Sequence, residues 1–367
     1  MALPSSLDAI LAHHLPRPES SPGVQVAIVS ADAVIYEAAN GLADAVGKPP
    51  LPPFNLGPLT TSHQANLYSA SKLFAACCAL RLIETGKISG PECDVRDLLP
   101  PGVRDRVPQG QCTVERLVTH TSGAPNPLPL SWVHCPGDEV DEASLLGEIL
   151  RRHPFKEGRG GGPRPYAYSN VGYWILGMAV TSALGADPSD FGRCCQELLF
   201  APGAGEGFLT LQEGELLVSD DFDPRAPMMS GHVKAWSVLS LAARLFCPPG
   251  TMGPSNAAGW VRTEPHLPDG ASYGGLVGSA RSIGMFLRRL LRGGRPLRGV
   301  VGDAILRPRS KRYDDLWPSR SSAPGCADLP QGGGGGRVAT SQYSSVPSRG
   351  WQVSASLDQR IPTWTAS

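Results

Sequence analysis

The chain has 367 residues, which is enough to bury one large hydrophobic core or two smaller ones. Its 33 basic and 33 acidic residues balance, so the overall charge gives no support for binding nucleic acid or an anionic membrane, both of which need a basic excess. Charged residues make up only 18% of the chain beside 43 glycines and 36 prolines, a composition that predicts long and numerous loops.

The sequence shows none of the usual signals for export, membrane insertion or metal binding. Its longest apolar runs, near 73–83 and 171–180, are too short to span a bilayer. Residues 1–8 have neither a basic nor an apolar signal-peptide region, so we expect a cytoplasmic protein. Nine cysteines without a C-x-x-C pair and eight histidines without ligand spacing predict a reduced protein with no metal.

In chain order, the first predicted elements are two β-type runs at 24–30 and 34–38, separated by a turn-sized gap, which indicates a hairpin. A proline-rich stretch at 47–63 follows. It leads to a helical pattern over 68–86 that is apolar nearly all round and stops at a glycine. Such a helix belongs in a core rather than on a surface.

One cation, Lys72, lies in the first turn of this helix, three residues after Ser69. Residues at this spacing share a helix face, so the amine and the hydroxyl can touch. The helix N-terminus and burial both disfavour the charged ammonium, and a neutral lysine beside a serine is a base beside a nucleophile. Most cations of this chain are arginines, which cannot give up a proton. The cation three residues after Ser69 is instead a lysine, which can, and this is the only Ser-x-x-Lys of the chain. The structural alternative is a lysine that reaches from a core helix to solvent.

From 90 to about 250 the pattern is mostly helical. Residues 113–123 begin with a plausible N-cap threonine and end on glycine. The only Tyr-x-Asn of the chain, Tyr168-Ser169-Asn170, begins an apolar helix that stops at Gly185. After about 255 the chain returns to α/β character, with a helix predicted at 280–292.

Together these motifs resemble the serine β-lactamase and penicillin-binding-protein superfamily. Ser69-x-x-Lys72 and Tyr168-x-Asn170 are similar to its first two motifs, in the form found in class C β-lactamases and their esterase and D,D-peptidase relatives. The segment 117–123 resembles the family's Leu-Leu-x-His-Thr-Ser-Gly, and 274–280 resembles a further family segment. The resemblance covers roughly residues 7–295.

The resemblance implies a role for each residue of these motifs. Ser69 attacks a carbonyl and becomes acylated, and Lys72 and Tyr168 share the removal of its proton. Asn170 would hydrogen-bond Lys72 and the acyl side chain of the substrate. The oxyanion would bind the backbone N–H of Ser69 and one N–H from a later strand. Taken alone, Tyr168 and Asn170 also fit a helix N-terminus with a packing tyrosine.

Two other residues of the family-like segments have plainer expectations. We expect His120 to be a packing residue at a helix end and Ser279 to be an N-cap.

The third family motif is where the chain departs from the pattern. The family has Lys-Thr-Gly, His-x-Gly or a glycine-rich variant on a strand lining the site, followed by two more strands and a helix. Here the candidate is the glycine run 332–336, with Gly333 and Gly334 as expected substrate-binding residues and only Arg337 as a nearby cation. The tail 337–367 is polar and aperiodic, so we expect it to be incomplete, as a truncation or a change of reading frame would make it.

The implied fold is α/β, of the β-lactamase/transpeptidase-like type: an antiparallel sheet flanked by helices, with an inserted all-helical domain. Residues 1–90 and 255–367 would form the discontinuous α/β domain and residues 91–254 the helical one. The active site would lie between the two domains.

The implied function is that of a cofactor-free serine hydrolase acting on a small-molecule ester or amide, of esterase, β-lactamase or D,D-peptidase type. A cytoplasmic location favours an ester or a small amide over cell-wall substrates. The alternative is a catalytically impaired relative that serves as a binding or scaffold protein, which the altered third motif suggests. The sequence leaves the substrate and the oligomeric state open.

Overall fold

The computed structural model describes residues 7–8, 22–46, 58–128, 132–135, 137–156, 164–200, 228–264, 266–291, 336–346 and 349–361.

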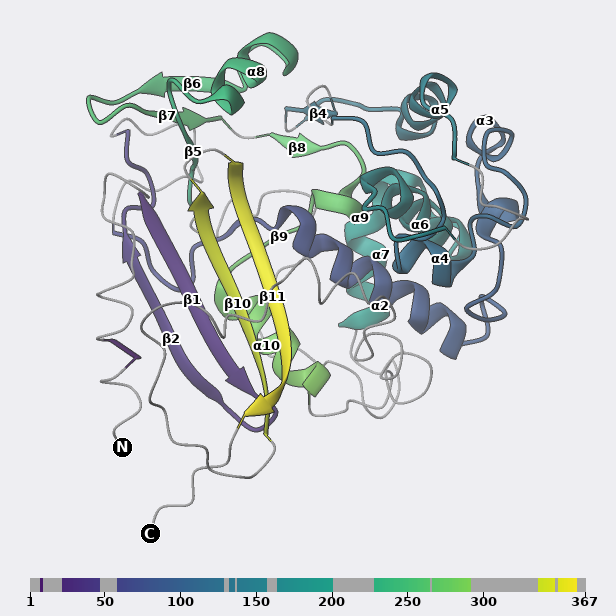
Figure 1. Ribbon diagram of the computed structural model, residues 1–367, viewed down its shortest axis with the longest axis horizontal. Helices are drawn as coiled ribbons and strands as arrows, with labels where there is room; N and C mark the ends of the chain where they lie inside the picture. The colour runs from purple at the N-terminus through teal and green to yellow at the C-terminus, as the bar shows by residue number, and fades with distance from the viewer. Residues whose placement is uncertain are drawn as a thin grey trace.

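The central sheet is built from both ends of the chain (Figure 1). Strands β1 (Gly23–Ser30) and β2 (Val34–Gly41) form the predicted hairpin. Strands β10 (Gly336–Val346) and β11 (Arg349–Ile361) complete an antiparallel sheet in the order β11-β10-β1-β2. The predicted architecture, a sheet flanked by helices and closed by both chain ends, is therefore what the structure has.

The tail, which we expected to be incomplete, supplies two strands. β10 pairs with β1 from Val26–Gln342 to Ser30–Val338, and β11 pairs with β10 along most of its length. The reason is that a strand needs backbone hydrogen bonds more than a strong apolar alternation. β1 offers an unpaired edge to any extended segment that reaches it.

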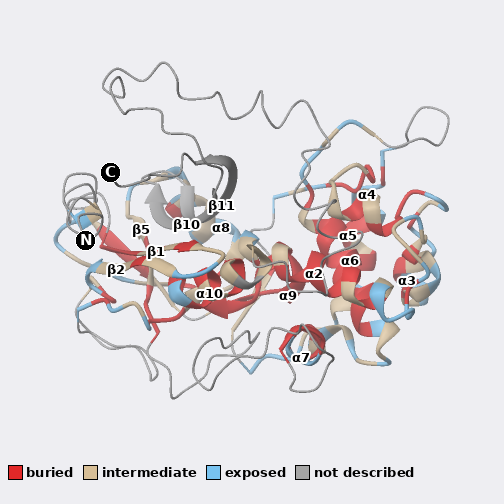
Figure 2. Cartoon of the chain, turned by 90° about the horizontal axis from the view of Figure 1, so that it is seen from below, coloured by how far each residue is buried: buried red, intermediate tan, exposed pale blue. Residues whose placement is uncertain are grey.

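The helices form a layer on the sheet and a bundle beside it. α10 (Ala280–Leu291) packs on β1, and Gly284 allows this contact because a Cβ there would lie 3.0 Å from that of Ala27. The bundle is centred on α2 (Ser71–Glu84) and α6 (Asn170–Ala183), which are largely buried in Figure 2. Phe74 of α2 stacks on Phe286 of α10 with ring centroids 4.5 Å apart, so one hydrophobic core joins the bundle to the sheet layer.

Shorter helices surround this pair: η2 (Val95–Leu98), α3 (Pro101–Arg104), α4 (Val114–Val118), α5 (Glu142–Arg152), η4 (Pro188–Asp190), α7 (Phe191–Leu199) and α9 (Ala271–Gly274). Two short ladders tie distant segments together. β3 (Ala65–Asn66) pairs with β9 (Val277–Gly278), and β4 (Val133–His134) pairs with β8 (Leu267–Pro268). No helix in the described parts of the chain is long and apolar enough to cross a membrane.

The region 91–254 is not all helical, which differs from the expectation. Besides β4 it contains β5 (Gly231–Lys234), α8 (Val238–Phe246) and most of β6 (Met252–Ser255). β5 and β6 flank β7 (Trp260–Thr263) in a small antiparallel sheet. The sequence analysis missed it because these strands are four residues long, too short for an alternating pattern to stand out.

Candidate active site

Ser69 lies in a tight 3₁₀ turn, η1 (Tyr68–Ala70), immediately before α2, and is exposed to solvent. Tyr68 has a φ of 44°, in the left-handed region that a bulky residue adopts only under strain. The turn is held by the fully buried Leu67, whose N–H donates to the carbonyl of Leu276 at 2.7 Å. The strained turn therefore places the Ser69 hydroxyl in solvent at the start of a buried helix.

Lys72 lies in the first turn of α2 and is 6% exposed. Its Nζ donates to the carbonyl oxygen of Tyr273 at 2.7 Å and to Oδ1 of Asn170 at 2.9 Å, and it lies 3.3 Å from Oγ of Ser69. Burial lowers the pKa of Lys72 from 10.5 to about 7. A neutral amine has two hydrogens, which match the two oxygen acceptors, and one lone pair, which is left for the Ser69 hydroxyl.

Tyr168 approaches the same hydroxyl from the other side. Its Oη lies 2.7 Å from Oγ of Ser69, and its ring centroid lies 4.9 Å from Nζ of Lys72. Burial raises the pKa of Tyr168 above 10, although the hydrogen bond with Ser69 opposes that shift. The phenol is therefore protonated at neutral pH, and of the two groups Lys72 is the better base.

The loop that carries Tyr168 and Asn170 is held by three hydrogen bonds to another loop. The N–H of Asn170 donates to Oδ1 of Asn126 at 2.9 Å, and the hydroxyl of Ser169 donates to the carbonyl of Pro125 at 2.7 Å. The N–H of Ser169 donates to Nδ1 of His120 at 3.1 Å. Ser169 also caps α6 by accepting the N–H of Gly172, which explains why the helix starts at Asn170.

His120 does pack against its neighbours, as expected, with its ring 4.7 Å from that of Tyr168 and 5.0 Å from that of Tyr173. It also has a polar role that the sequence analysis missed. Burial, with a smaller effect of the charge on Lys72, lowers the pKa of His120 to about 3, so Nδ1 stays free to accept the Ser169 N–H. Its φ of 56° turns its carbonyl toward the N–H of Ala167. The His-Thr-Ser-Gly segment was the signal available for this role.

Tyr273 is a second site residue that the sequence analysis did not identify. It contributes a backbone carbonyl, which every residue type has, so no motif signals it. α9 carries it and is fixed on α6, because the hydroxyl of Ser272 donates to the carbonyl of Tyr173 at 2.9 Å. The Tyr273 ring lies 5.7 Å from that of Trp174, which is fully buried.

The other expectations have mixed outcomes. Gly333 and Gly334 lie outside the described residues. Arg337 is on the inner strand β10, whereas β11 is the strand that lies against η1. A second oxyanion donor from the sheet would therefore come from β11. Ser279 is an N-cap, as expected, since its Oγ accepts the N–H of Ser282 at 3.1 Å.

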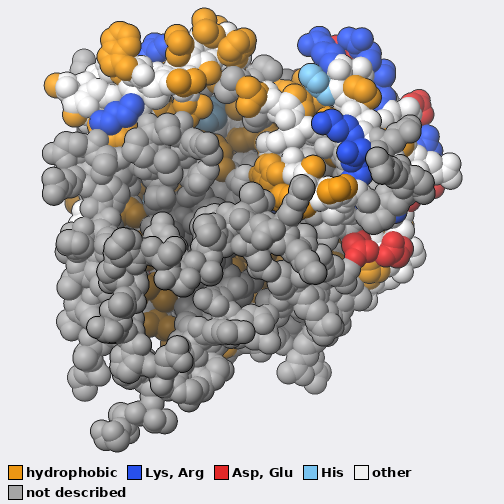
Figure 3. All heavy atoms as spheres, viewed as in Figure 1, with side chains coloured by type: hydrophobic (Ala, Val, Ile, Leu, Met, Phe, Trp, Pro, Cys, Tyr) orange, Lys and Arg blue, Asp and Glu red, His pale blue; other side chains and the backbone are white. Residues whose placement is uncertain are grey.

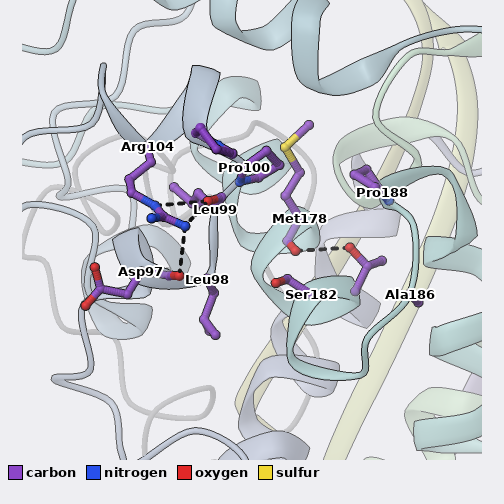
Figure 4. Close-up of a pocket in the computed structure, with 11 residues that line it drawn as sticks. Asp97, Leu98, Leu99, Pro100, Arg104, Met178, Ser182, Ala186 and Pro188 are labelled. Carbon is purple, nitrogen blue, oxygen red and sulfur yellow. Dashed lines mark hydrogen bonds between the residues drawn. The ribbon is translucent and has the colours of Figure 1, made fainter.

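A cavity of about 280 Å³ lies elsewhere, between η2 and α3 on one side and the C-terminal end of α6 on the other (Figure 4). Met178 and Ser182 line it from α6. The Arg104 guanidinium at its edge already donates to the carbonyls of Leu99 and Asp97. This cavity shares no lining residue with the Ser69 site.

Comparison with known proteins decides the family. The family model described as Beta-lactamase matches residues 11–322, most of the chain. The chain belongs to the beta-lactamase family. This membership places it in the serine hydrolase class.

Solved structures show the same fold for this beta-lactamase family member. The D-amino acid amidase from Ochrobactrum anthropi SV3 is 23% identical with a TM-score of 0.52, over 80% of this chain and 71% of the amidase. The octameric penicillin-binding protein homologue from Pyrococcus abyssi is 17% identical with a TM-score of 0.53, over 98% of this chain and 74% of the homologue. SurE is 19% identical with a TM-score of 0.52, and the match spans 66% of its length. At these identities the likeness concerns the fold alone. A comparison with curated proteins finds no match.

Proposed function

We propose that this chain is a serine hydrolase that cleaves an ester or amide bond of a small-molecule acyl substrate through an acyl-enzyme on Ser69. One observation carries the proposal: the hydrogen bonds around Lys72 suit a neutral amine whose lone pair faces the Ser69 hydroxyl. Such an amine, with its pKa lowered to about 7, is half deprotonated at neutral pH.

The first step follows from this geometry. The Ser69 hydroxyl gives its proton to Nζ of Lys72 while Oγ attacks the carbonyl carbon of the substrate. The oxyanion that forms takes the backbone N–H of Ser69, and a second N–H from the nearby strand β11 would complete the pair of donors.

The second step needs a proton for the leaving group. Tyr168 holds one, and its Oη is 2.7 Å from the attacking oxygen, so it could protonate a leaving group that departs from the carbonyl carbon bonded to Oγ. The proton that Lys72 took from Ser69 passes back to the Tyr168 oxygen, so both groups regain their starting state. Water then attacks the ester carbonyl and gives a proton to Lys72, and the acyl group leaves as Ser69 Oγ regains its hydrogen. Asn170, whose Oδ1 accepts from Lys72 and whose backbone N–H donates to Asn126, would offer its side-chain amide to the acyl group.

A fluorophosphonate probe tests the proposal. We expect covalent label on Ser69 in the purified chain and none in Ser69→Ala, which should keep its fold because the hydroxyl is exposed. Ser62→Ala is the matched control, since Ser62 is also exposed and hydrogen-bonds only locally to Thr60. Label that maps by mass spectrometry to another residue would overturn the assignment.

Substrate class needs a second measurement. A panel of p-nitrophenyl esters, nitrocefin and D-Ala-D-Ala peptides separates esterase, β-lactamase and D,D-peptidase activity. A folded chain that takes no probe and turns over none of the panel would favour the alternative, a catalytically impaired relative with a binding role. The glycine run 332–336 without a preceding lysine or histidine is the feature that favours this alternative.

A further inference from the structure

Helix α8 presents its apolar face outward. Ser240 is fully buried, at 0% exposure, whereas four apolar side chains are exposed by 60% to 84%: Val238, Leu241, Leu245 and Phe246. Just before the helix, Trp236 is 99% exposed. A helix on a soluble domain normally turns such residues toward the core. Figure 3 shows hydrophobic side chains gathered at this end of the molecule, where Figure 1 places α8 and β6.

This outward face does not come from a loosely attached helix. α8 packs on β5, and the small sheet beneath it is tied to the end of β2 through Asp44. Arg262 donates to Asp44 at 3.1 Å, and His232 lies 3.3 Å from the same carboxylate. Burial alone would raise the pKa of Asp44, but hydrogen bonds, led by that from His232, outweigh it and hold the pKa well below its usual range. The small sheet on which α8 packs is therefore anchored to the rest of the fold.

Within the described residues 228–263, which carry this face, the charged side chains have one sign. Residues 228–263 contain Lys234, Arg244 and Arg262 and no aspartate or glutamate. Arg262 is used by Asp44 and Glu264. That leaves Arg244, which is exposed, and Lys234, whose Nζ lies 3.8 Å from the centre of the Trp260 ring. This part of the chain therefore combines an apolar helix face with two basic side chains.

We propose that this surface, formed by Trp236 and α8, docks on an anionic lipid surface. An amphipathic helix with apolar residues, a tryptophan and cations suits the boundary between headgroups and acyl chains. Lys234 and Arg244 have no acidic residue to pair with within 228–263, and anionic headgroups would supply the opposite charge. A second copy fits less well, because a twofold contact through this face would bring cations against cations.

Two residues near the docking surface interact with Tyr68, the residue before Ser69. Cys247 follows α8 and lies near enough to Tyr68 that a negative charge on its thiol would raise the pKa of Tyr68 beyond the effect of burial. Nε2 of His266, just after β7, lies 3.4 Å from Oη of Tyr68. A docked molecule would hold η1 near the lipid. Access of Ser69 to acyl groups there rests on the proposed function, whereas docking itself does not.

Vesicle cosedimentation of the full chain tests the docking. We expect binding to vesicles that contain phosphatidylserine, much weaker binding to pure phosphatidylcholine, and loss of the difference at high salt, where the charges are screened. The double variant Leu241→Ser/Leu245→Ser should bind about tenfold more weakly or worse. Leu128→Ser is the matched control, because Leu128 is 80% exposed and lies outside this surface.

A charge variant tests the other half of the argument without touching the apolar face. Arg244→Glu should lower binding to anionic vesicles about tenfold. Lys87→Glu, a reversal at an exposed lysine after α2, should leave it unchanged. Ser69→Ala should also bind normally, so this experiment and the probe experiment can fail independently.

Tryptophan fluorescence gives a readout that a purely structural role would not move. Vesicles should shift the emission to the blue in the native chain, and Trp236→Phe should lose that shift while still sedimenting with them. Absence of vesicle binding, or equal losses in Leu128→Ser and the α8 variant, would overturn the proposal. So would self-association that the α8 variant abolishes, since the surface would then be an interface between copies.

Discussion

At the scale of single residues, the site is organised around the burial of one amine. Holding the pKa of Lys72 at about 7 instead of 10.5 corresponds to roughly 5 kcal/mol of lost stability for the charged form. The fold accepts that cost because the neutral amine has acceptors for both of its hydrogens in Asn170 and Tyr273. The same arrangement leaves its lone pair next to Ser69.

Lys72→Arg should therefore behave like Lys72→Ala despite keeping the positive charge. Arginine cannot act as a base, and its planar guanidinium does not match the two acceptors around Nζ. We expect kcat/KM for an ester substrate to fall by about 10²–10⁴. Lys87→Arg, at an exposed position after α2, is the control and should be unaffected. Near-normal activity in Lys72→Arg would mean that the base lies elsewhere.

The pH profile should report the same group. The folded-state pKa of Lys72 lies below its unfolded value, so the fraction of base rises as pH passes through about 7 and then levels off. We expect kcat/KM to rise with it. His120 is neutral throughout this range because its pKa is lowered to about 3. Tyr168→Phe should reduce the rate but keep the inflection.

One other buried group needs a control in that profile. Burial raises the pKa of Glu142 to about 7, and its carboxylate accepts the indole N–H of Trp174 at 2.7 Å. Glu142→Gln should keep the inflection if Lys72 is its source. An inflection that disappears in Glu142→Gln or in Tyr168→Phe would assign it to that residue instead.

At the scale of elements, the crossing of α6 and α9 decides where the Tyr273 carbonyl lies. Gly177 of α6 faces Ser272 of α9 so closely that a Cβ would collide with the serine side chain. Ser272 itself is tied to α6 by its hydrogen bond to Tyr173. The missing side chain at Gly177 therefore lets α9 approach α6 and brings the next carbonyl within reach of Lys72.

Gly177→Ala should lower the free energy of unfolding by about 1–3 kcal/mol, because a closely packed contact has to open. It should also reduce kcat, since the shift displaces an acceptor of Lys72. Gly172→Ala on the same helix is the control, because a Cβ there would meet only ordinary contacts at 3.5 Å. Denaturant unfolding and ester turnover measure both effects. Equal stability of the two variants would contradict this account of the crossing.

At the scale of the whole molecule, the two chain ends depend on each other. β1 has β2 on one side and β10 on the other, so β1 is an inner strand of the sheet only while the tail is present. α10 also contacts both β1 and β10, which makes the tail part of the layer that supports the core.

Truncation after Gly335 should therefore leave β1 with an unpaired edge and make the protein aggregate. Truncation after Ile361, which keeps β10 and β11, is the control and should remain soluble. Size-exclusion chromatography separates the two outcomes. Hydrogen exchange on the full chain should show protected amides in β10, which is paired on both sides. A soluble shortened chain with unchanged melting would show that the tail is dispensable.

The sequence by itself determined the parts of this protein that depend on local chemistry. Ser69 and Lys72 could be paired because three-residue spacing brings side chains together on any helix. Tyr168 and Asn170 could be placed at a helix start by capping chemistry, and the resemblance of these motifs predicted the family that the comparison confirmed.

Only the tertiary structure decided the remainder. The Tyr273 carbonyl could not be predicted, because a backbone acceptor has no residue identity until the fold brings it to Lys72. His120 became an acceptor through its burial and its φ, neither of which its residue type specifies. The polar tail became strand because β1 offered it hydrogen bonds. The apolar face of α8 points outward because the opposite side of the helix, with Ser240, is the side buried in the fold. Sequence patterns record local preference, whereas these four features depend on partners from distant parts of the chain.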